Sequence, residues 1–337
     1  MLSSSVAVAP LIREPLHAPV AHLIRGGVVE GIHYGSVVVL GAEGKVQLQL
    51  GDIEAAFYPR SALKPVQAVA MVRAGLPLDG ELLSLTAASH SGEERHLAGT
   101  RRILELAGLT EDHLRNVTDM PFDPVVRDEW IRTGRLPSRL AQNCSGKHAA
   151  MLYTCRLNGW SLDGYLDPEH PLQQHIRATM AELTGVPVGH DAIDGCGAPL
   201  FGTSVRGIAR AFGRLVQAEP GTPERAVADA MREHPYYVGG TGHQNTTLME
   251  TVPGALAKGG AEGVIGVAAA DGTAVAMKIV DGSPRATTLI ALRVLEALGT
   301  PIADARALTD LPVLGGGVPV GAIELGADLT AALERLA

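Results

Sequence analysis

The apolar and polar positions of the first fifty residues predict strands joined by a tight turn. Short apolar runs lie at 28–29 and 36–40, and apolar residues alternate with polar ones over 45–50. Period-two alternation is typical of strands that bury one face. Residues 41–44 (GAEG) separate two of these runs and predict a hairpin loop. We therefore expect strand, turn and strand over 21–50.

Helical periodicity follows this segment. Residues 62–74 are rich in Ala, Leu, Val and Met, with apolar positions three and four apart. This pattern predicts a buried helix that begins near Ser61, with Pro65 in its first turn, where a missing N–H is tolerated. Loops with Pro and Gly separate further helical patterns at 94–107, 172–183, 201–216 and 226–232.

Strand patterns return only at 264–270 and 273–280, on either side of Asp271-Gly272, a strong hairpin dipeptide. A final amphipathic helix is expected over 286–298, where it would cover the sheet. Strands at both ends of a helical centre predict an α+β fold in which the terminal strands share one antiparallel sheet.

The same pattern predicts how the chain is divided. We expect a single folded unit over 20–337, with a mostly helical central part at about 92–250 and helices flanking the sheet. Residues 1–19 would form an N-terminal extension. We find no internal repeat.

Composition and charge narrow the class of protein. The 337 residues carry 28 basic and 36 acidic side chains, a net charge of -8, without a basic cluster that could bind nucleic acid. No apolar run approaches the roughly 18 residues of a membrane-spanning helix, and the first residues make a poor export signal. Three cysteines, an odd number, argue against a disulfide scaffold. We expect a cytoplasmic protein with no nucleic-acid or membrane partner.

Ser61 and Lys64 are the first candidates for chemistry. At the start of a helix, positions i and i+3 share a face, so the hydroxyl and the amine can come within hydrogen-bond reach. A desolvated, neutral lysine can take the proton of a serine nucleophile, and the neighbours of Lys64 are mostly apolar. The alternative is a helix-capping Ser61 followed by a solvated lysine.

Residues 88–94 (ASHSGEE) carry a second candidate. Ser91 and Glu94 have the spacing of a capping box, which predicts that Ser91 caps the following helix. Ser89 and His90 are not explained in this way. They would lie just before a helix N-terminus, where polar groups are well placed to bind a substrate.

Two cysteines lie among Gly and polar residues, Cys144 in the segment NCSGKH and Cys196 in the segment DGCG. With His148 or Lys147, these thiols could hold zinc and leave one position open for water. Neither segment contains a Cys-x-x-Cys pair, so the spacing also allows two small buried apolar side chains.

Residues 258–263 (KGGAEG) precede an expected strand. Glycines let backbone N–H groups approach a ligand closely, so an oxyanion site is possible near Gly260 and Ala261, with Lys258 adding charge. The segment lacks the spacing of a phosphate-binding loop. The alternative is a turn that leads into the strand at Val264.

Six segments, in this order, resemble the rhizobial-type L-asparaginases, the asparaginase II family. They are 25–30 (RGGVVE), 60–67 (RSALKPVQ), 88–91 (ASHS), 143–148 (NCSGKH), 194–196 (DGC) and 258–262 (KGGAE). Six ordered motifs are far more specific than one. The resemblance runs from about residue 25 to the C-terminal end. It implies a fold similar to serine β-lactamases and β-lactamase-like glutaminases, and hydrolysis of L-asparagine to L-aspartate and ammonia.

The resemblance also implies roles for individual residues. Ser61 would be the nucleophile and Lys64 its base in an acyl-enzyme mechanism, with Ser89 and Lys258 as a second pair that relays protons. The implied zinc ligands are Cys144, Lys147 and Cys196. The implied substrate-binding residues are Arg60, Asp194, His148, Gly260 and Ala261, with Asp194 on the substrate's ammonium. Relatives of this kind are commonly homodimers, so we expect a homodimer with one zinc per subunit.

Several hypotheses about the function remain open at this point. The chain lacks the Ser-x-Asn and Lys-Thr-Gly motifs of penicillin-recognising enzymes, which argues against β-lactam hydrolysis. A glutaminase or another amidohydrolase is an alternative, because one methylene is worth only about 1 to 3 kcal/mol of discrimination. A non-catalytic protein that binds zinc or an amino acid is a second alternative, against which both Ser-Lys pairs argue. The polar loop at 236–247 either lines the site or forms a surface turn.

Overall fold

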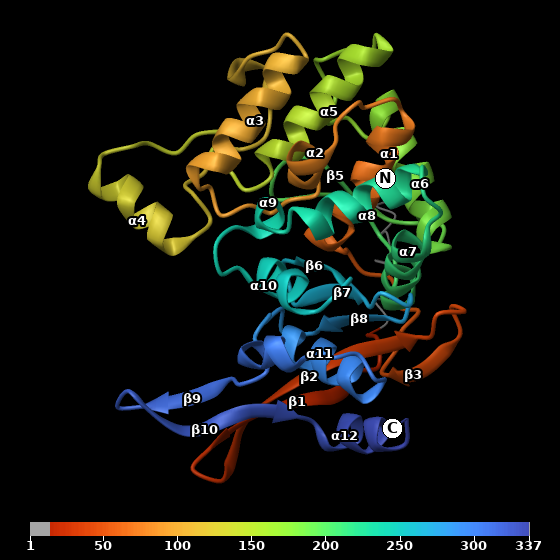
Figure 1. The fold of residues 1–337 in the computed structure, drawn as a ribbon, viewed down its shortest axis with the longest axis vertical. Helices are drawn as coiled ribbons and strands as arrows, with labels where there is room; N and C mark the ends of the chain where they lie inside the picture. Colours follow the sequence, from red (N-terminus) through yellow and green to blue (C-terminus); the bar gives the residue numbers. More distant parts are fainter. Residues whose placement is uncertain (1–13, 337) are drawn as a thin grey trace, which may run out of the picture.

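The computed structural model describes residues 14–336 (Figure 1). Residues 1–13 of the expected N-terminal extension lie outside these described residues, and the division into 1–19 and 20–337 stays a prediction. The first strand begins at Ala18. In the part of the chain that the structure describes, no helix is long and apolar enough to cross a bilayer.

An antiparallel sheet of eight strands forms the lower half of the molecule in Figure 1, in the order β6-β7-β8-β2-β1-β10-β9, with β3 paired to β2. A separate pair, β4 and β5, lies outside it. The strands are β1 (Ala18–Arg25), β2 (Val28–Leu40), β3 (Val46–Leu50), β4 (Asp191–Ile193), β5 (Pro199–Phe201), β6 (Leu256–Gly260), β7 (Val264–Ala268), β8 (Ala274–Ile279), β9 (Pro312–Gly315) and β10 (Val318–Leu325).

Helices make up most of the chain between β3 and β6. They are α1 (Lys64–Arg73), α2 (Gly80–Thr86), α3 (Glu94–Leu106), α4 (Pro124–Arg132), α5 (Ser145–Asn158), α6 (Pro171–Thr184), α7 (Val205–Gln217), α8 (Pro223–Glu233), α9 (Tyr236–Gly239) and α10 (Gln244–Thr251), followed later by α11 (Thr287–Ala297) and α12 (Ala327–Glu334). Three short 3-10 turns are η1 (Arg60–Leu63), η2 (Glu111–His113) and η3 (Ala303–Leu308). The α+β fold with a shared terminal sheet is confirmed.

Strand β2 organises the sheet because it is long enough to have three partners. Its first half pairs with β1 and its second half with β3 on one edge, while β8 pairs along the other edge. The two apolar runs at 28–29 and 36–40 therefore belong to one strand. A turn at Gly26 and Gly27 joins β1 to β2, with φ of 55° and 81°, values that glycine adopts without strain.

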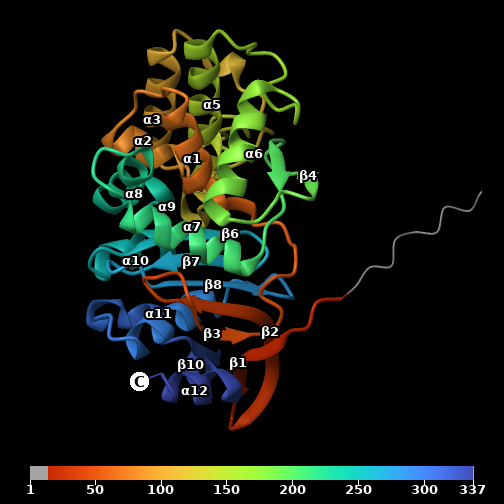
Figure 2. The same cartoon turned by 90° about the vertical axis from the view of Figure 1, so that its right-hand side faces the viewer.

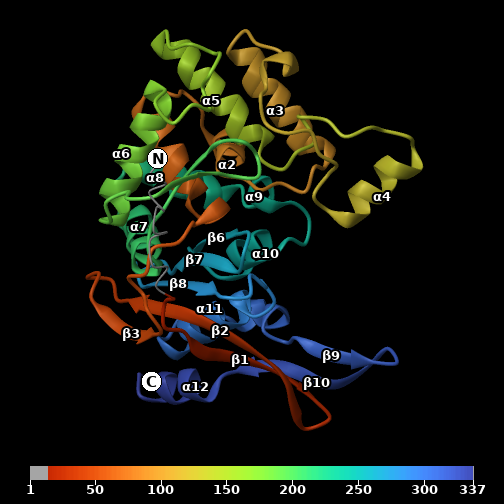
Figure 3. The ribbon, with the colours of Figure 1, turned by 180° about the vertical axis from the view of Figure 1, so that it is seen from behind.

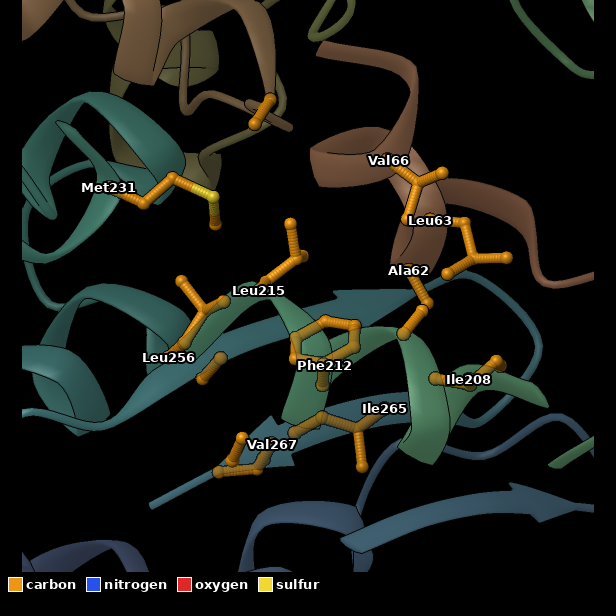
Figure 4. Close-up of a cluster of buried hydrophobic side chains, with 14 of the residues drawn as sticks. Ala62, Leu63, Val66, Ile208, Phe212, Leu215, Met231, Leu256, Ile265 and Val267 are labelled. Carbon is orange, nitrogen blue, oxygen red and sulfur yellow. The ribbon is translucent and has the colours of Figure 1, made fainter. Parts of the chain in front are cut away.

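Helices pack against the sheet and position the first candidate motif. Helix α7 lies against β7 and β8, and α11 also contacts these strands (Figure 2). All five residues of β7 are buried, as expected for a strand between two helical layers. Figure 4 shows Ala62, Leu63 and Val66 in the same apolar cluster as Phe212 of α7. This packing places η1 at the end of the sheet.

Three expectations about the C-terminal third were wrong. Residues 256–260 form β6, although we expected no strand there before 264, and β9 and β10 follow η3, although we expected no strand after 280. The helix at 286–298 is α11, and it is not the last, because α12 follows β10. Gly and Pro interrupt the apolar pattern of these strands, and their place in the sheet is fixed by pairing with distant strands.

The positions at which helices start also differ from those expected. Residues 60–63 form a 3-10 turn, so α1 begins at Lys64, with Pro65 in its first turn as expected. The pattern at 201–216 begins with Phe201 in β5, and α7 starts at Val205. The expected cap of α3 was also wrong: its N-cap is Glu93, and no side chain caps the helix.

Candidate active site

A cavity of about 450 Å³ lies where η1, β6 and α10 meet. Figure 1 shows β6 and α10 side by side, and Figure 3, which is seen from behind, agrees. Five residues expected at the site line it: Ser61, Ser89, Lys258, Gly260 and Ala261. The other lining residues are Phe122, Asn143, His243, Gln244, Asn245, Gly259 and Pro284. The structure therefore brings three separate sequence motifs to one cavity.

Ser61 lies at the wall of this cavity in a strained turn. The residue before it, Arg60, has a φ of 51°, a left-handed conformation that costs a residue with a side chain roughly 1 to 2 kcal/mol. Packing of Leu63 into the core holds the turn in place. Among the described residues no hydrogen bond engages the Ser61 hydroxyl, so this oxygen is free to face a ligand.

Ser89 lies between two buried lysines. Its Oγ is 3.0 Å from Nζ of Lys64 and 3.0 Å from Nζ of Lys258. The amine of Lys64 also donates to the carbonyl of Ala88 at 2.5 Å, and that of Lys258 to the carbonyl of Gly259 at 2.7 Å. The lysines of the two expected Ser-Lys pairs thus meet at one hydroxyl, that of Ser89, and Lys64 makes no hydrogen bond to Ser61.

Lys258 has the chemistry of a neutral base. Its side chain is completely buried. Burial, and the neighbouring amine of Lys64, hold the pKa of Lys258 well below its ordinary value. An unprotonated amine can accept the proton of a hydroxyl, and the hydroxyl of Ser89 is within reach.

The edge of β6 forms the wall of the cavity next to η1. Its glycines let η1 approach closely, since a Cβ at Gly260 would lie 2.9 Å from the amide nitrogen of Ala62 and 3.2 Å from that of Ser61. The N–H of Gly259 is bound by Oδ1 of Asn245 at 2.9 Å. Ala261, the residue that follows the strand, leaves its backbone at the cavity.

The two loop cysteines and Lys147 form a second buried cluster directly behind Ser89. Nζ of Lys147 lies 3.3 Å from Sγ of Cys196, and Nζ of Lys64 lies 3.0 Å from Sγ of Cys144. Cys144 is the N-cap residue of α5, and Cys196 lies between β4 and β5. Both cysteines are free thiols. Lys64 therefore touches both the hydroxyl of Ser89 and the sulfur cluster.

The pKa values of this cluster show one thiolate and one thiol. The hydrogen bond from Cys144, and then the charge of Lys147, lower the pKa of Cys196 to about 5. That same hydrogen bond, together with burial, raises the pKa of Cys144 to about 12. Burial would lower the pKa of Lys147, but the two cysteines and Asp194 raise it above its ordinary value.

This donor set fits a zinc ion. Thiolates and an amine are soft and borderline ligands that zinc accepts in tetrahedral sites. A separation of 3.3 Å between Nζ of Lys147 and Sγ of Cys196 is close to the distance between neighbouring ligands of one tetrahedral zinc. Among residues 14–336, no group of three His, Cys, Asp or Glu side chains could hold a metal. Zinc here would therefore need the amine of Lys147.

Asp194 and Arg60 link the cysteine cluster to the turn that carries Ser61. Nε of Arg60 donates to Oδ1 of Asp194 at 2.7 Å, and the N–H of Gly195 donates to the same oxygen. Burial would raise the pKa of Asp194, but Lys147 and Arg60 hold it below its ordinary value. Neither Asp194 nor Arg60 is among the residues that line the cavity.

His148 does not reach the cavity. Its ring is fully buried in α5, and Nδ1 lies 2.8 Å from the hydroxyl of Tyr165. That hydroxyl accepts the N–H of Arg115, so its own proton is free for the imidazole. The ring is therefore held by Tyr165 inside the protein and is not among the residues that line the cavity.

The loop at 236–247 lines the cavity, so one of the two interpretations left open by the sequence is correct. The carboxylate of Glu93 holds the loop: it accepts hydrogen bonds from the backbone and hydroxyl of Thr241, from Tyr236 and from Ser91. Ser91 binds Glu93 in this way instead of capping α3.

Sequence reasoning missed several lining residues. His243, Gln244 and Asn245 lie in that Gly-rich loop, which was the available signal for them. Asn143 begins the segment NCSGKH but was not singled out as a site residue, and Phe122 and Pro284 come from segments that carry no motif. Only the fold brings these three residues to the cavity.

Comparison with known proteins agrees with these motifs. The model of the L-asparaginase II family matches residues 21–325. No curated protein sequence matches the chain. Among solved structures, a β-lactamase from Mycobacterium bovis is 14% identical with a TM-score of 0.42, covering 74% of this chain and 88% of its own. A Bacillus subtilis glutaminase is 16% identical with a TM-score of 0.32, covering 72% and 79%.

A third solved structure, a putative β-lactamase from Bacteroides dorei, is 15% identical with a TM-score of 0.38, covering 73% of this chain and 85% of its own. At these scores the likeness carries no conclusion about activity. The family model spans nearly the whole chain and includes all six segments that carry the resemblance. The chain therefore belongs to the L-asparaginase II family.

Proposed function

We propose that this amidohydrolase of the L-asparaginase II family hydrolyses L-asparagine to L-aspartate and ammonia through an acyl-enzyme on Ser61. The observation that carries the proposal is the cavity that combines a free serine hydroxyl with a chain of two lysines joined by Ser89. Amide hydrolysis requires a nucleophile, a base and an acid for the leaving amine. This cavity supplies a candidate for each.

Ser61 is the better nucleophile of the two serines. Its hydroxyl lines the cavity without a partner among the described residues, whereas the hydroxyl of Ser89 is held by two amines. A hydroxyl bound between two amines is suited to passing protons, because each amine can exchange a proton with it. In this proposal Ser89 and Lys258 serve Lys64, the base that follows Ser61 by one turn.

The proton path balances over the reaction. Lys258 is unprotonated because its pKa is low, and the hydroxyl of Ser89 joins it to Lys64, so a proton can move between the two amines. Neutral Lys64 then takes the proton of Ser61 as the oxygen attacks the side-chain amide carbon, and returns it to the leaving ammonia. Water hydrolyses the ester by the reverse proton transfers and restores Ser61.

The negative charge on the carbonyl oxygen needs donors during attack. The backbones near Ser61 and Ala261 adjoin at the cavity, since Gly260 packs directly against η1. Two backbone N–H donors there would stabilise an oxyanion without reorganisation. In this scheme Gly260 and Ala261 act through their backbone alone.

Zinc bound by Cys144, Lys147 and Cys196 would supply a fixed positive charge beside the site. Because Ser61 already supplies a nucleophile, the role proposed for this charge is to orient the substrate and not to activate water. In the proposal Asp194 binds the substrate's ammonium, which requires the substrate to reach past the residues that line the cavity, and Arg60 keeps the Asp194 carboxylate in place. His148 does not line the cavity and does not contact substrate.

A homodimer is the proposed assembly. Apolar side chains are exposed together at one end of the sheet, on β2, β9 and β10: Val28, Val29, Ile32, Leu314, Val318 and Val320. Figure 3 shows hairpin β9–β10 projecting from the same side of the molecule as α4. Contiguous exposed apolar residues typically mark an interaction surface, and a second copy is the partner proposed here.

The acyl-enzyme can be tested by trapping. Hydroxylamine added during turnover of L-asparagine should yield aspartyl β-hydroxamate in place of part of the aspartate, because it competes with water for the ester. Quenching in acid followed by peptide mass mapping should place the added aspartyl group on Ser61. An aspartyl group on Ser89, or hydrolysis without hydroxamate, would contradict the assignment.

A further inference from the structure

His243 carries a hydrogen-bond donor at the wall of the cavity. His243 is among the residues that line the cavity, and it is half-buried. Nδ1 accepts the backbone N–H of Asn245 at 3.1 Å, as the N-cap of α10. An Nδ1 that accepts cannot carry the proton, so the neutral ring carries it on Nε2. Among the described residues this Nε2–H has no partner.

Close packing holds the ring in this orientation. A Cβ at Gly239 would lie 2.6 Å from Nδ1 and 2.7 Å from Cγ of His243, so this edge of the ring lies directly on the backbone of α9. Nε2 is on the opposite edge of the ring. Burial and the charge of Lys258 lower the pKa of His243 to about 4, while Asp123 acts in the opposite direction. The ring is therefore neutral, and the donor is present, at neutral pH.

Gln244 supplies a second donor beside the first. Its Oε1 accepts the hydroxyl of Thr288 at 2.9 Å, which directs the other end of the amide elsewhere. Nε2 of Gln244 lies toward the backbone of Gly259, at 3.5 Å from the position of a Cβ there. Both donors come from consecutive residues at the start of α10.

The cavity suits a negatively charged group at this wall. No Asp or Glu is among its lining residues, and its one lysine, Lys258, is already bound to Ser89 and to the carbonyl of Gly259. An amino-acid amide has a reacting amide, an ammonium and a carboxylate. The carboxylate has two oxygens and needs donors, and hydrogen bonds to an ionised carboxylate are stronger than those between neutral groups.

We propose that His243 and Gln244 bind the α-carboxylate of the substrate, and that His243 thereby selects amides that carry this group. This inference rests on the proposed function for the identity of the substrate. His243 touches substrate but takes no part in proton transfer.

Two variants separate the two ring nitrogens. His243→Asn keeps an acceptor in the place of Nδ1 and so keeps the helix cap, but it removes the Nε2 donor. His243→Gln extends an amide N–H toward the place of Nε2 and loses the cap. His170→Asn is the matched control, because Nδ1 of His170 caps α6 in the same way, accepting from Leu172, away from the cavity.

The test compares L-asparagine with 3-aminopropanamide, the same amide without the α-carboxylate. His243→Asn should raise KM for L-asparagine roughly tenfold or more, as expected for losing a hydrogen bond to a charged group, with kcat changed far less. It should leave kcat/KM for 3-aminopropanamide as in the wild type. His243→Gln should recover most of the lost affinity and lower Tm, and His170→Asn should keep wild-type kinetics.

An equal loss on both amides, or an unchanged KM for L-asparagine in folded His243→Asn, would overturn the inference. Failure of the proposed function is a different outcome, in which the wild type releases ammonia from no amide. Calorimetry with L-aspartate then decides the inference: weaker binding to His243→Asn than to the wild type supports it. Equal affinity, or no binding to the wild type, overturns it.

Discussion

Lys64 and Ser89 are hydrogen-bonded to each other at 3.0 Å although they lie 25 positions apart, and Lys64 has no such bond to Ser61, which precedes it by one turn. The i and i+3 spacing brings Ser61 and Lys64 to one face, but the amine extends past its neighbour toward the carbonyl of Ala88. The second serine is thus part of the same machinery as the first.

Removing the two serine hydroxyls should have different consequences. Ser61→Ala should lower kcat by about 10⁴-fold, because the nucleophile is lost and only binding and oxyanion contacts remain. Ser89→Ala should lower kcat by about 10² to 10⁴-fold, the usual contribution of a proton-transfer group. Exposed Ser161→Ala is the control. Full activity of folded Ser61→Ala would show that another residue attacks.

Lys258 should lower the stability of the folded protein while being required for ammonia release. Its folded pKa is lowered, so between that pKa and 10.5 the unfolded chain binds more protons and stability rises with pH. Lys258→Met should therefore raise Tm at pH 7, by about 2 to 4 °C for each kcal/mol gained, and should flatten that pH dependence. It should also abolish most ammonia release.

The pH profile of the wild type checks the same group. Activity should rise with pH through the lowered pKa of Lys258, because only the neutral amine accepts a proton. Lys258→Arg, which stays charged, should be inactive at every pH tested. An Arg variant with wild-type activity would rule out Lys258 as a proton acceptor.

Zinc binding should depend on the two cysteines of the buried cluster and not on the third cysteine, Cys155. Cys144→Ala and Cys196→Ala should purify without bound metal, while Cys155→Ala, a buried thiol inside α5, should keep it. Chelation should lower Tm of the wild type, since a ligand bound only to the folded state stabilises it. Metal analysis and thermal melts measure both effects. Equal zinc content in all three variants would contradict the site.

Zinc affinity should also depend on pH. Binding must remove a proton from Lys147, and from Cys144, whose pKa is about 12, because both ligands have to be unprotonated. The apparent affinity should therefore fall as pH falls, and titration calorimetry in buffers of different ionisation enthalpy should show proton release.

The close contact between β6 and η1 should be sensitive to one methyl group. Gly260→Ala would place its Cβ 2.7 Å from the carbonyl oxygen of Pro59 and 2.9 Å from the amide nitrogen of Ala62, so the turn carrying Ser61 must shift. A displacement of about 1 Å at a reacting group costs on the order of 10²-fold in rate. Gly189→Ala, with no atom within 4 Å of the new methyl, should keep the wild-type rate.

The exposed apolar residues on the hairpin should decide the oligomeric state. Val318→Asp, which puts a charge on an exposed side chain of β10, should shift the protein to monomers in sedimentation at micromolar concentration. The exposed Val46→Asp on β3 is a matched change away from this surface. A monomeric wild type would contradict the proposed dimer.

The sequence predicted the elements with strong local signals. The Asp271-Gly272 turn between β7 and β8, and the helices α3, α6 and α8, follow from turn chemistry and periodicity. The edge strands were missed because Gly and Pro weaken their pattern: β6 contains Gly259 and Gly260, and β9 begins with Pro312. Their places are set by pairing with distant strands.

The candidate site was predictable only as far as its motifs reached. Ser61, Ser89 and Lys258 belong to short recognisable segments, and the cavity unites them. The meeting of Lys64 with Cys144 depends on how α1 packs against α5, which no local pattern contains. The role of His243 could not be predicted from the sequence, because it depends on a helix-capping hydrogen bond and on the packing of α9 against the ring.

The most direct test of the account is ammonia release from L-asparagine and, in parallel, from L-glutamine by the purified zinc-loaded protein, with and without chelation. The account predicts strong release from L-asparagine, much weaker release from L-glutamine, and loss of activity when zinc is removed. Folded, zinc-loaded protein that releases ammonia from neither amide would contradict it.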